Sequence, residues 1–75
     1  MKESFASFIR AKRIANGLTQ QECANALGLD HRATFLKKEK GLWEFSFLDV
    51  VNFAKLLGVP ASVLIAEWEE TIKEI

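Results

Sequence analysis

Apolar residues recur along the chain at intervals of three and four, the spacing that gathers side chains on one face of an α-helix. Glycines and a proline divide this pattern into five segments, and a serine, threonine or aspartate precedes each of the first four. No segment alternates strictly between apolar and polar residues, as a half-buried strand would. The pattern therefore predicts an all-α chain of five short helices.

Capping signals set the bounds of the first two predicted helices. Ser4 is placed to cap a helix that ends at Asn16-Gly17. Thr19, followed three residues later by Glu22, has the pattern of a capping box and opens a second helix, which Gly28 ends. The apolar face of the first helix consists of Phe5, Phe8, Ile9 and the aliphatic stem of Arg13. The inward residues of the second are Cys23, Ala24 and Leu27.

The same signals recur in the second half of the chain. Asp30 is placed to cap a third helix from His31 to about Lys38, with Gly41 as its end. Ser46 and Asp49 repeat the capping pattern for a fourth helix, which Gly58 stops, and Pro60 suits the first turn of a fifth. The third helix has Phe35 and Leu36 as apolar contacts. The fourth has Phe47, Val50, Val51, Phe53, Ala54 and Leu57.

Length and composition exclude several classes of protein. Seventy-five residues form one domain, and Cys23 has no second cysteine for a disulfide. One cysteine with one histidine, His31, does not make a convincing metal site, so no cofactor is expected. No apolar run approaches the roughly 20 residues of a membrane span, and the start Met1-Lys2-Glu3-Ser4 lacks the features of a secretory signal. We expect a cytoplasmic protein.

The formal net charge of zero conceals a division along the chain. Basic residues outnumber acidic ones from Met1 to Leu42, and acidic residues outnumber basic ones from Trp43 onward. A polyanion such as DNA would be attracted by the first half and repelled by the second. The alternative is that so short a chain shows this asymmetry by chance.

The second and third predicted helices, joined by a tight turn, have the pattern of a helix-turn-helix. The supporting residues are Ile9-Arg10, Arg13, Gly17-Leu18-Thr19-Gln20, Glu22, Ala24, Leu27-Gly28, Glu39-Lys40-Gly41, Ser46, Val50, Ala54 and Leu57-Gly58-Val59. In this order and spacing the chain resembles the phage-repressor-like (Cro or XRE type) family of DNA-binding domains over roughly residues 5 to 65. The resemblance implies a five-helix lambda-repressor-like bundle, one domain over residues 1–75, with 66–75 as a C-terminal helical extension.

The resemblance also implies roles for particular residues. Arg13 and Glu39 would form a structural ion pair between the first helix and the end of the third. Thr19 and Gln20 would contact a DNA phosphate at the start of the second helix, where the helix dipole favours an anion. Base contacts would come from the third helix, whose side chains would lie in the major groove. The residues at those positions are Arg32, Ala33, Thr34 and Lys37, with His31 at the edge and Lys38 and Lys40 toward phosphates.

Three departures from the family pattern affect this assignment. The stretch from Gly28 to Glu39 is one residue longer than usual, so the base-contacting positions could shift by one. Lys38 replaces a residue that is usually apolar, so either its stem lies along the core or Leu36 takes that place. The loop that carries Trp43 and Phe45 replaces a polar stretch. One of these aromatics completes the core by folding on the fourth helix, or the pair forms a protein-contact patch.

The C-terminal residues offer a second surface. Leu64, Trp68, Ile72 and Ile75 follow one another at helical spacing. They predict a dimer contact, with packing on the chain's own first helix as the alternative. A two-fold dimer would present two third helices to successive major grooves of a near-palindromic operator.

The function predicted from the sequence is DNA-binding transcriptional regulation, by a repressor-like homodimer on double-stranded DNA without a small-molecule ligand. The alternative is a helix-turn-helix scaffold used as a protein-interaction module, such as an antitoxin-like partner, with DNA binding weak or lost. An enzyme is not expected, because no nucleophile stands beside a candidate base and no carboxylates are paired in a predicted cleft.

Overall fold

The computed structural model describes residues 4–73, and within this part the chain forms five α-helices and no strand. The helices are α1 (Phe5–Ala15), α2 (Gln20–Ala26), α3 (Arg32–Glu39), α4 (Phe47–Leu57) and α5 (Ala61–Lys73). The predicted all-α five-helix bundle is confirmed. None of these helices is long and apolar enough to cross a membrane.

Side chains close the starts of three helices as their sequences predict. The Ser4 hydroxyl accepts the N–H of Ser7 at the start of α1. Complete capping boxes open α2, between Thr19 and Glu22, and α4, between Ser46 and Asp49. Each box satisfies two backbone N–H groups that the first turn of a helix otherwise leaves unpaired.

The predicted start of α3 is wrong by one residue, and Asp30 is not its cap. His31 is the N-cap, with an extended backbone and no side-chain hydrogen bond, so α3 begins at Arg32. The segment from Leu27 to His31 connects α2 to α3.

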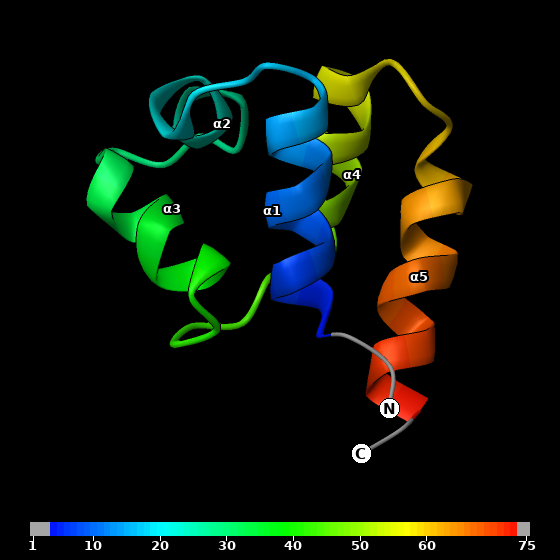
Figure 1. Ribbon diagram of the computed structural model, residues 1–75. Helices are drawn as coiled ribbons and strands as arrows, with labels where there is room; N and C mark the ends of the chain where they lie inside the picture. The colour runs from blue at the N-terminus through cyan, green and yellow to red at the C-terminus, as the bar shows by residue number, and fades with distance from the viewer. Residues whose placement is uncertain (1–3, 74–75) are drawn as a thin grey trace.

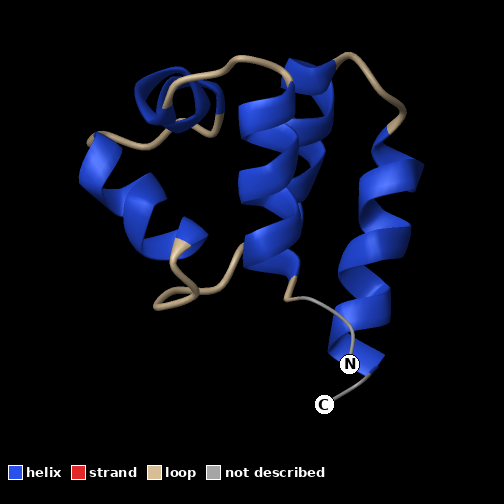
Figure 2. Cartoon of the chain, viewed as in Figure 1, coloured by secondary structure: helices blue, strands red, loops and turns tan. Residues whose placement is uncertain are grey.

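The helices are arranged around α1 and α4 (Figure 1). On one side α5 packs on α4 and α1, and on the other α3 packs on α1 and α2, while α2 also contacts α4. In the same view α2 is seen nearly end-on and α3 runs obliquely below it, so the two helices are strongly inclined to each other (Figure 1). Short loops make every connection between helices, including the one from α3 to α4 (Figure 2).

Among the described residues, the core is built from all five helices and from two residues outside them, Leu27 and Phe45. Its fully buried side chains include Phe35 of α3, Phe53 of α4 and Leu64 of α5. Phe45, in the loop before α4, is also buried, and its ring lies edge-on to Phe5 and Phe35 at centroid distances of 5.6 and 6.4 Å. Such perpendicular aromatic pairs are a favoured ring geometry.

Phe47 does not belong to the buried face of α4, contrary to the sequence pattern. It is 56% exposed, and its ring lies 6.2 Å from the ring of Trp68 in α5. Val50 and Phe53 define the centre of the buried face, and Phe47 lies at its edge, at the first position of the helix. The apolar spacing places Phe47 near the core without placing it inside.

Candidate nucleic-acid interface

The helix α3 has one buried and one exposed face. Phe35 and Glu39 are buried on the inner side. On the opposite side Ala33, Lys37 and Lys40 follow one another at intervals of four and three and are exposed. Arg32 lies on the side of Glu39 by helical spacing and is exposed at the first position of the helix. We call Arg32, Ala33, Lys37 and Lys40 the outer face of α3. Of the other two residues predicted to contact bases, His31 is exposed and Thr34 is half-buried.

An ion pair fixes the C-terminal end of α3 against α1. Arg13 Nε lies 2.6 Å from Glu39 Oε2, and its Nη2 donates to Oε1 at 3.3 Å. The remaining amine of the guanidinium, Nη1, donates to the carbonyl of Leu18 at 3.0 Å. Planar two-point contacts of this kind are the strongest arginine–carboxylate geometry. With only 14% and 3% of the two side chains exposed, solvent screens the pair little.

Gln20 joins this ion pair rather than standing free at the start of α2. Its Nε2 donates to Glu39 Oε1 at 3.2 Å, so one carboxylate ties α1, α2 and α3 together. This connection sets the position of α3 relative to α2, and with it the direction of the outer face. A phosphate contact by Gln20 stays a prediction, and its side-chain amide is already held by Glu39.

Thr19 is exposed at the same helix start, where its hydroxyl and N–H complete the capping box. The hydroxyl accepts the N–H of Glu22 at 3.0 Å, and the Thr19 N–H donates to Glu22 Oε1 at 2.9 Å. Hydrogen bonding of the Glu22 carboxylate to Thr19, first to its backbone N–H and then to its side chain, lowers the pKa of Glu22. A phosphate that reached Thr19 would therefore meet an ionised carboxylate, and that contact also stays a prediction.

A second ion pair holds Lys38 to the start of α4. The Lys38 ammonium lies 2.5 Å from Asp49 Oδ2 and 3.3 Å from the carbonyl of Glu44. It lies 6.0 Å from the centre of the Phe45 ring, and 13% of the side chain is exposed. The stem of Lys38 thus takes the usually apolar place, and its charge is neutralised inside the protein. We leave Lys38 out of the proposed DNA surface.

The loop between α3 and α4 separates its two aromatics. Phe45 completes the core, in one cluster with buried residues of α4, and its ring lies edge-on to Phe5 of α1 and Phe35 of α3. Trp43 stays 49% exposed and its neighbour Leu42 70% exposed. The ammonium of Lys37 lies 4.6 Å from the centre of the Trp43 ring, a cation–π contact. Trp43 is therefore a surface residue at the end of the outer face of α3.

The predicted dimer stripe on α5 is partly buried within the chain itself. Leu64 is only 2% exposed and belongs to the core, so its assignment to a dimer contact is wrong. Trp68 is half-buried against the core beside Phe47, which agrees in part with packing on the chain's own helices. Ile75 lies outside the described residues, as does the side chain of Ile72.

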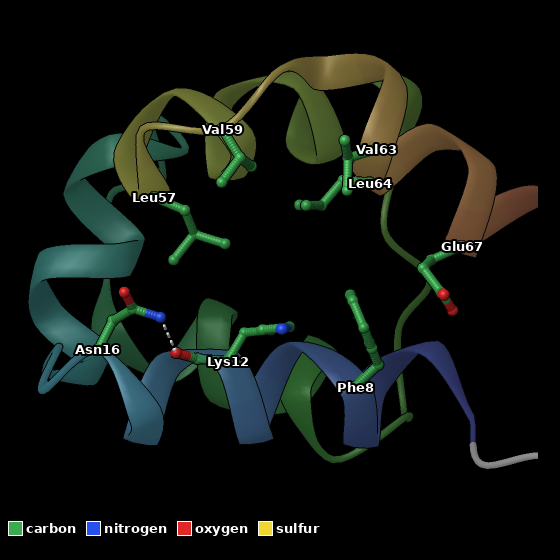
Figure 3. A pocket seen from close by; sticks show the side chains of 8 residues that line it. All are labelled: Phe8, Lys12, Asn16, Leu57, Val59, Val63, Leu64 and Glu67. Carbon is green, nitrogen blue, oxygen red and sulfur yellow. Dashed lines mark hydrogen bonds between the residues drawn. The ribbon is translucent and has the colours of Figure 1, made fainter.

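A shallow hollow of about 390 Å³ lies between α1, the end of α4 and α5 (Figure 3). Phe8 projects into it from α1, and Leu57, Val59, Val63 and Leu64 line the opposite wall. Lys12, Asn16 and Glu67 form its polar rim, with the Lys12 ammonium 5.6 Å from the Phe8 ring. It combines residues of α1, α4 and α5, whereas the outer face belongs to α3.

Cys23 and the candidate metal-ligating side chains are the remaining reactive groups of the described residues. Cys23 is fully buried, and burial raises the pKa of its thiol to about 11, which opposes formation of the reactive thiolate. Across residues 4–73 no three histidine, cysteine, aspartate or glutamate side chains gather as metal ligands. The described surface offers exposed charged groups and hydrogen-bonding groups.

One curated protein is similar to most of this chain. Over 70 residues the chain is 37% identical to the cryptic phage CTXphi transcriptional repressor RstR of Vibrio cholerae. The match covers 93% of this chain and 62% of the repressor, so the chain spans less than two thirds of that relative's length. A match of this length includes both α2 and α3. No family model matches the chain.

Proposed function

We propose that this chain is a sequence-specific DNA-binding transcription regulator of the phage-repressor-like (Cro or XRE) type. The observation that carries the proposal is its similarity to a phage transcriptional repressor over nearly its whole length. The inclined pair of α2 and α3 supports a helix-turn-helix, and the exposed cations of α3 suit a helix that enters the major groove (Figure 1). Such a regulator acts in the cytoplasm and needs no cofactor.

In this proposal the outer face of α3 contacts the bases. Arg32 can donate two hydrogen bonds to the O6 and N7 of a guanine, and Lys37 can donate to the same atoms as a point charge. The methyl groups of Ala33 and Thr34 suit contact with a thymine methyl group, and His31 lies at the edge of the surface. Lys40, with Thr19 and Gln20 of α2, is assigned to phosphates, which fix the position of the protein on the duplex.

We further propose that the protein acts as a homodimer through α5. Trp68 and the end of the predicted stripe, Ile72 and Ile75, form the proposed contact. A two-fold dimer would place two copies of α3 about 34 Å apart, one helical turn of DNA, on a near-palindromic operator. A monomer in sedimentation at high micromolar concentration, with and without operator DNA, would contradict this part of the proposal.

Selection of bound duplexes from a random pool, repeated at two salt concentrations, tests the DNA-binding proposal. The expected product is an inverted repeat. Because the outer face brings cations against a polyanion, we expect binding to weaken as the salt concentration rises. Recovery of no enriched sequence, together with binding that does not depend on salt, would refute the proposal.

A protein-interaction module is the second candidate, and a specific observation favours it. Leu42 and Trp43 at one end of the loop, and Phe47 and Leu48 at the start of α4, are each about half exposed or more. Exposed apolar groups of this size are enriched in protein interfaces. In that case substitution of Arg32 and Lys37 would leave the partner bound, whereas loss of Trp43 and Phe47 would release it.

A further inference from the structure

Lys37 occupies the centre of the outer face of α3, and the loop that follows the helix holds it at both ends. Its carbonyl accepts the N–H groups of Leu42 and Trp43 at 2.9 and 3.3 Å. Its ammonium lies 4.6 Å from the centre of the Trp43 ring. The backbone hydrogen bonds of the loop therefore fix the position of the indole, and the Lys37 ammonium lies over the indole ring.

Packing of the core does not account for this indole. Phe45 fills the adjacent core position, and Trp43 remains 49% exposed. Within the described part of the chain, neither Arg32 nor Lys40 of the same face lies over an aromatic ring, so Lys37 is treated differently from its neighbours. The cation–π contact with Trp43 therefore belongs to Lys37 and not to the outer face as a whole.

We propose that Trp43 is a positioning residue that determines the base preference of Lys37. The inference rests on the proposed DNA-binding function. A lysine has a flexible four-carbon stem and a point charge without the fixed fork of arginine, so its direction must be imposed from outside. Ordering such a side chain carries one of the largest entropic penalties among side chains. An indole that already holds the ammonium reduces that penalty before DNA arrives and limits the acceptors within reach.

The effect should appear in discrimination between sequences and not in general attraction to DNA. Non-specific binding depends on charge, which the indole leaves unchanged. Specific binding depends on where the ammonium lies relative to base acceptors. Removal of the ring should therefore weaken binding to the preferred duplex and leave binding to unrelated duplexes as it was.

The experiment compares Trp43→Ala, Trp43→Phe and Leu42→Ala on the selected duplex, on duplexes changed at single base pairs, and on unrelated DNA. Trp43→Ala should bind the selected duplex about twofold to fivefold more weakly, the range of an exposed cation–π contact, and lose preference at one base pair. Trp43→Phe keeps a ring face and should recover most of the preference. Leu42→Ala removes an exposed apolar side chain of the same loop without touching the ammonium and should bind as the wild type does.

A double-mutant cycle with Lys37→Met separates this role from a merely structural one. In the Lys37→Met background Trp43→Ala should have no further effect on binding, because the residue being positioned is gone. In a Trp68→Phe background Trp43 is the remaining tryptophan, and its fluorescence in the free protein should change on Lys37→Met.

The outcomes separate the two levels of the proposal. If no variant and no wild-type protein selects a duplex, the proposed function fails, and this inference fails with it. If the wild type selects a duplex and Trp43→Ala binds it equally well or more tightly, the positioning role is overturned and DNA binding stands. The same conclusion follows if the effect of Trp43→Ala persists unchanged in the Lys37→Met background.

Discussion

The two charged surfaces of α3 have opposite surroundings. Glu39 and Lys38 lie where the helix meets the rest of the molecule, and each is paired with a residue far away in the chain, Arg13 and Asp49. Arg32, Lys37 and Lys40 lie in solvent on the outer face. A helix of eight residues thus carries charges that hold it in place and charges that it displays.

This difference teaches that stability and binding are separable within one short helix. A buried ion pair that loses one partner leaves a charge without compensation, so substitutions on the inner side should destabilise the fold. Exposed cations contribute little to stability, so substitutions on the outer face should alter binding alone. Each of the following predictions challenges or refines that contrast, in order of expected effect.

Glu39→Ala should produce the largest effect, a decrease of about 3 kcal/mol or more in the free energy of unfolding. It strands the half-buried Arg13 guanidinium and releases Gln20 from the same carboxylate. Urea unfolding followed by circular dichroism measures the change. Glu44→Ala removes an exposed carboxylate of the neighbouring loop and should stay within about 0.5 kcal/mol of the wild type. A decrease below about 1 kcal/mol for Glu39→Ala would mean that the network stabilises little.

Arg32→Glu combined with Lys37→Glu should weaken binding to the selected duplex at least about 100-fold, roughly 2.7 kcal/mol, with unchanged circular dichroism. Both residues are exposed, and both would then repel phosphates. The matched control, Lys12→Glu with Lys55→Glu, makes the same charge change on α1 and α4 and should remain within about threefold of wild-type binding, because salt screens distant charges. Equal losses in the two variants would indicate attraction by overall charge instead of a defined face.

Asp49→Ala should cost about 2 kcal/mol of unfolding free energy, and Lys38→Met about 1 kcal/mol. Asp49 accepts from both the Lys38 ammonium and the Ser46 N–H, so its loss removes an ion pair and a helix cap. Lys38→Met keeps an apolar stem beside Phe45 and leaves the cap intact. Thermal unfolding of both variants ranks them, and the reverse order would show that the lysine contributes more than the cap.

The smallest effect concerns Cys23 and alkaline pH. Burial raises the pKa of this thiol from an ordinary value of 9.0 to about 11. As the pH rises, the unfolded chain therefore loses the thiol proton before the folded chain does, and stability falls. The contribution is fully present below pH 9 and is lost as the pH approaches and passes 11. Unfolding of wild type and Cys23→Ala between pH 8 and 11 isolates it, and identical pH profiles would contradict the prediction.

Local signals in the sequence predicted much of the fold. The capping boxes at Thr19 and Ser46 depend on residues three positions apart, so their hydrogen bonds are decided within one helical turn. Gly58 ends α4 with a φ of +73°, in the left-handed region that other residues rarely adopt. These features depend on neighbouring residues alone, so they can be predicted without knowing which elements pack against the helix.

The candidate site was predictable in part. The exposure of Ala33, Lys37 and Lys40 follows from the helical period once Phe35 is placed in the core, whereas the period alone would place Arg32 on the buried side with Glu39. The destination of each loop aromatic did not follow, because Trp43 and Phe45 have similar apolar character and lie two residues apart. Space beside Phe5 and Phe35 decided that Phe45 is buried, and that space is created by α1 and α3 together.

The sequence by itself determined where three of the five helices begin, after Ser4, Thr19 and Ser46, and where Gly58 ends α4. Only the tertiary structure decided the start of α3 at Arg32, the exposure of Phe47, the burial of Lys38 against Asp49, and the contact between Lys37 and Trp43. The physical reason is distance along the chain. Helix caps and the helical period depend on residues a few positions apart. The ion pairs and the burial of particular rings depend on contacts that form only when separate helices pack together.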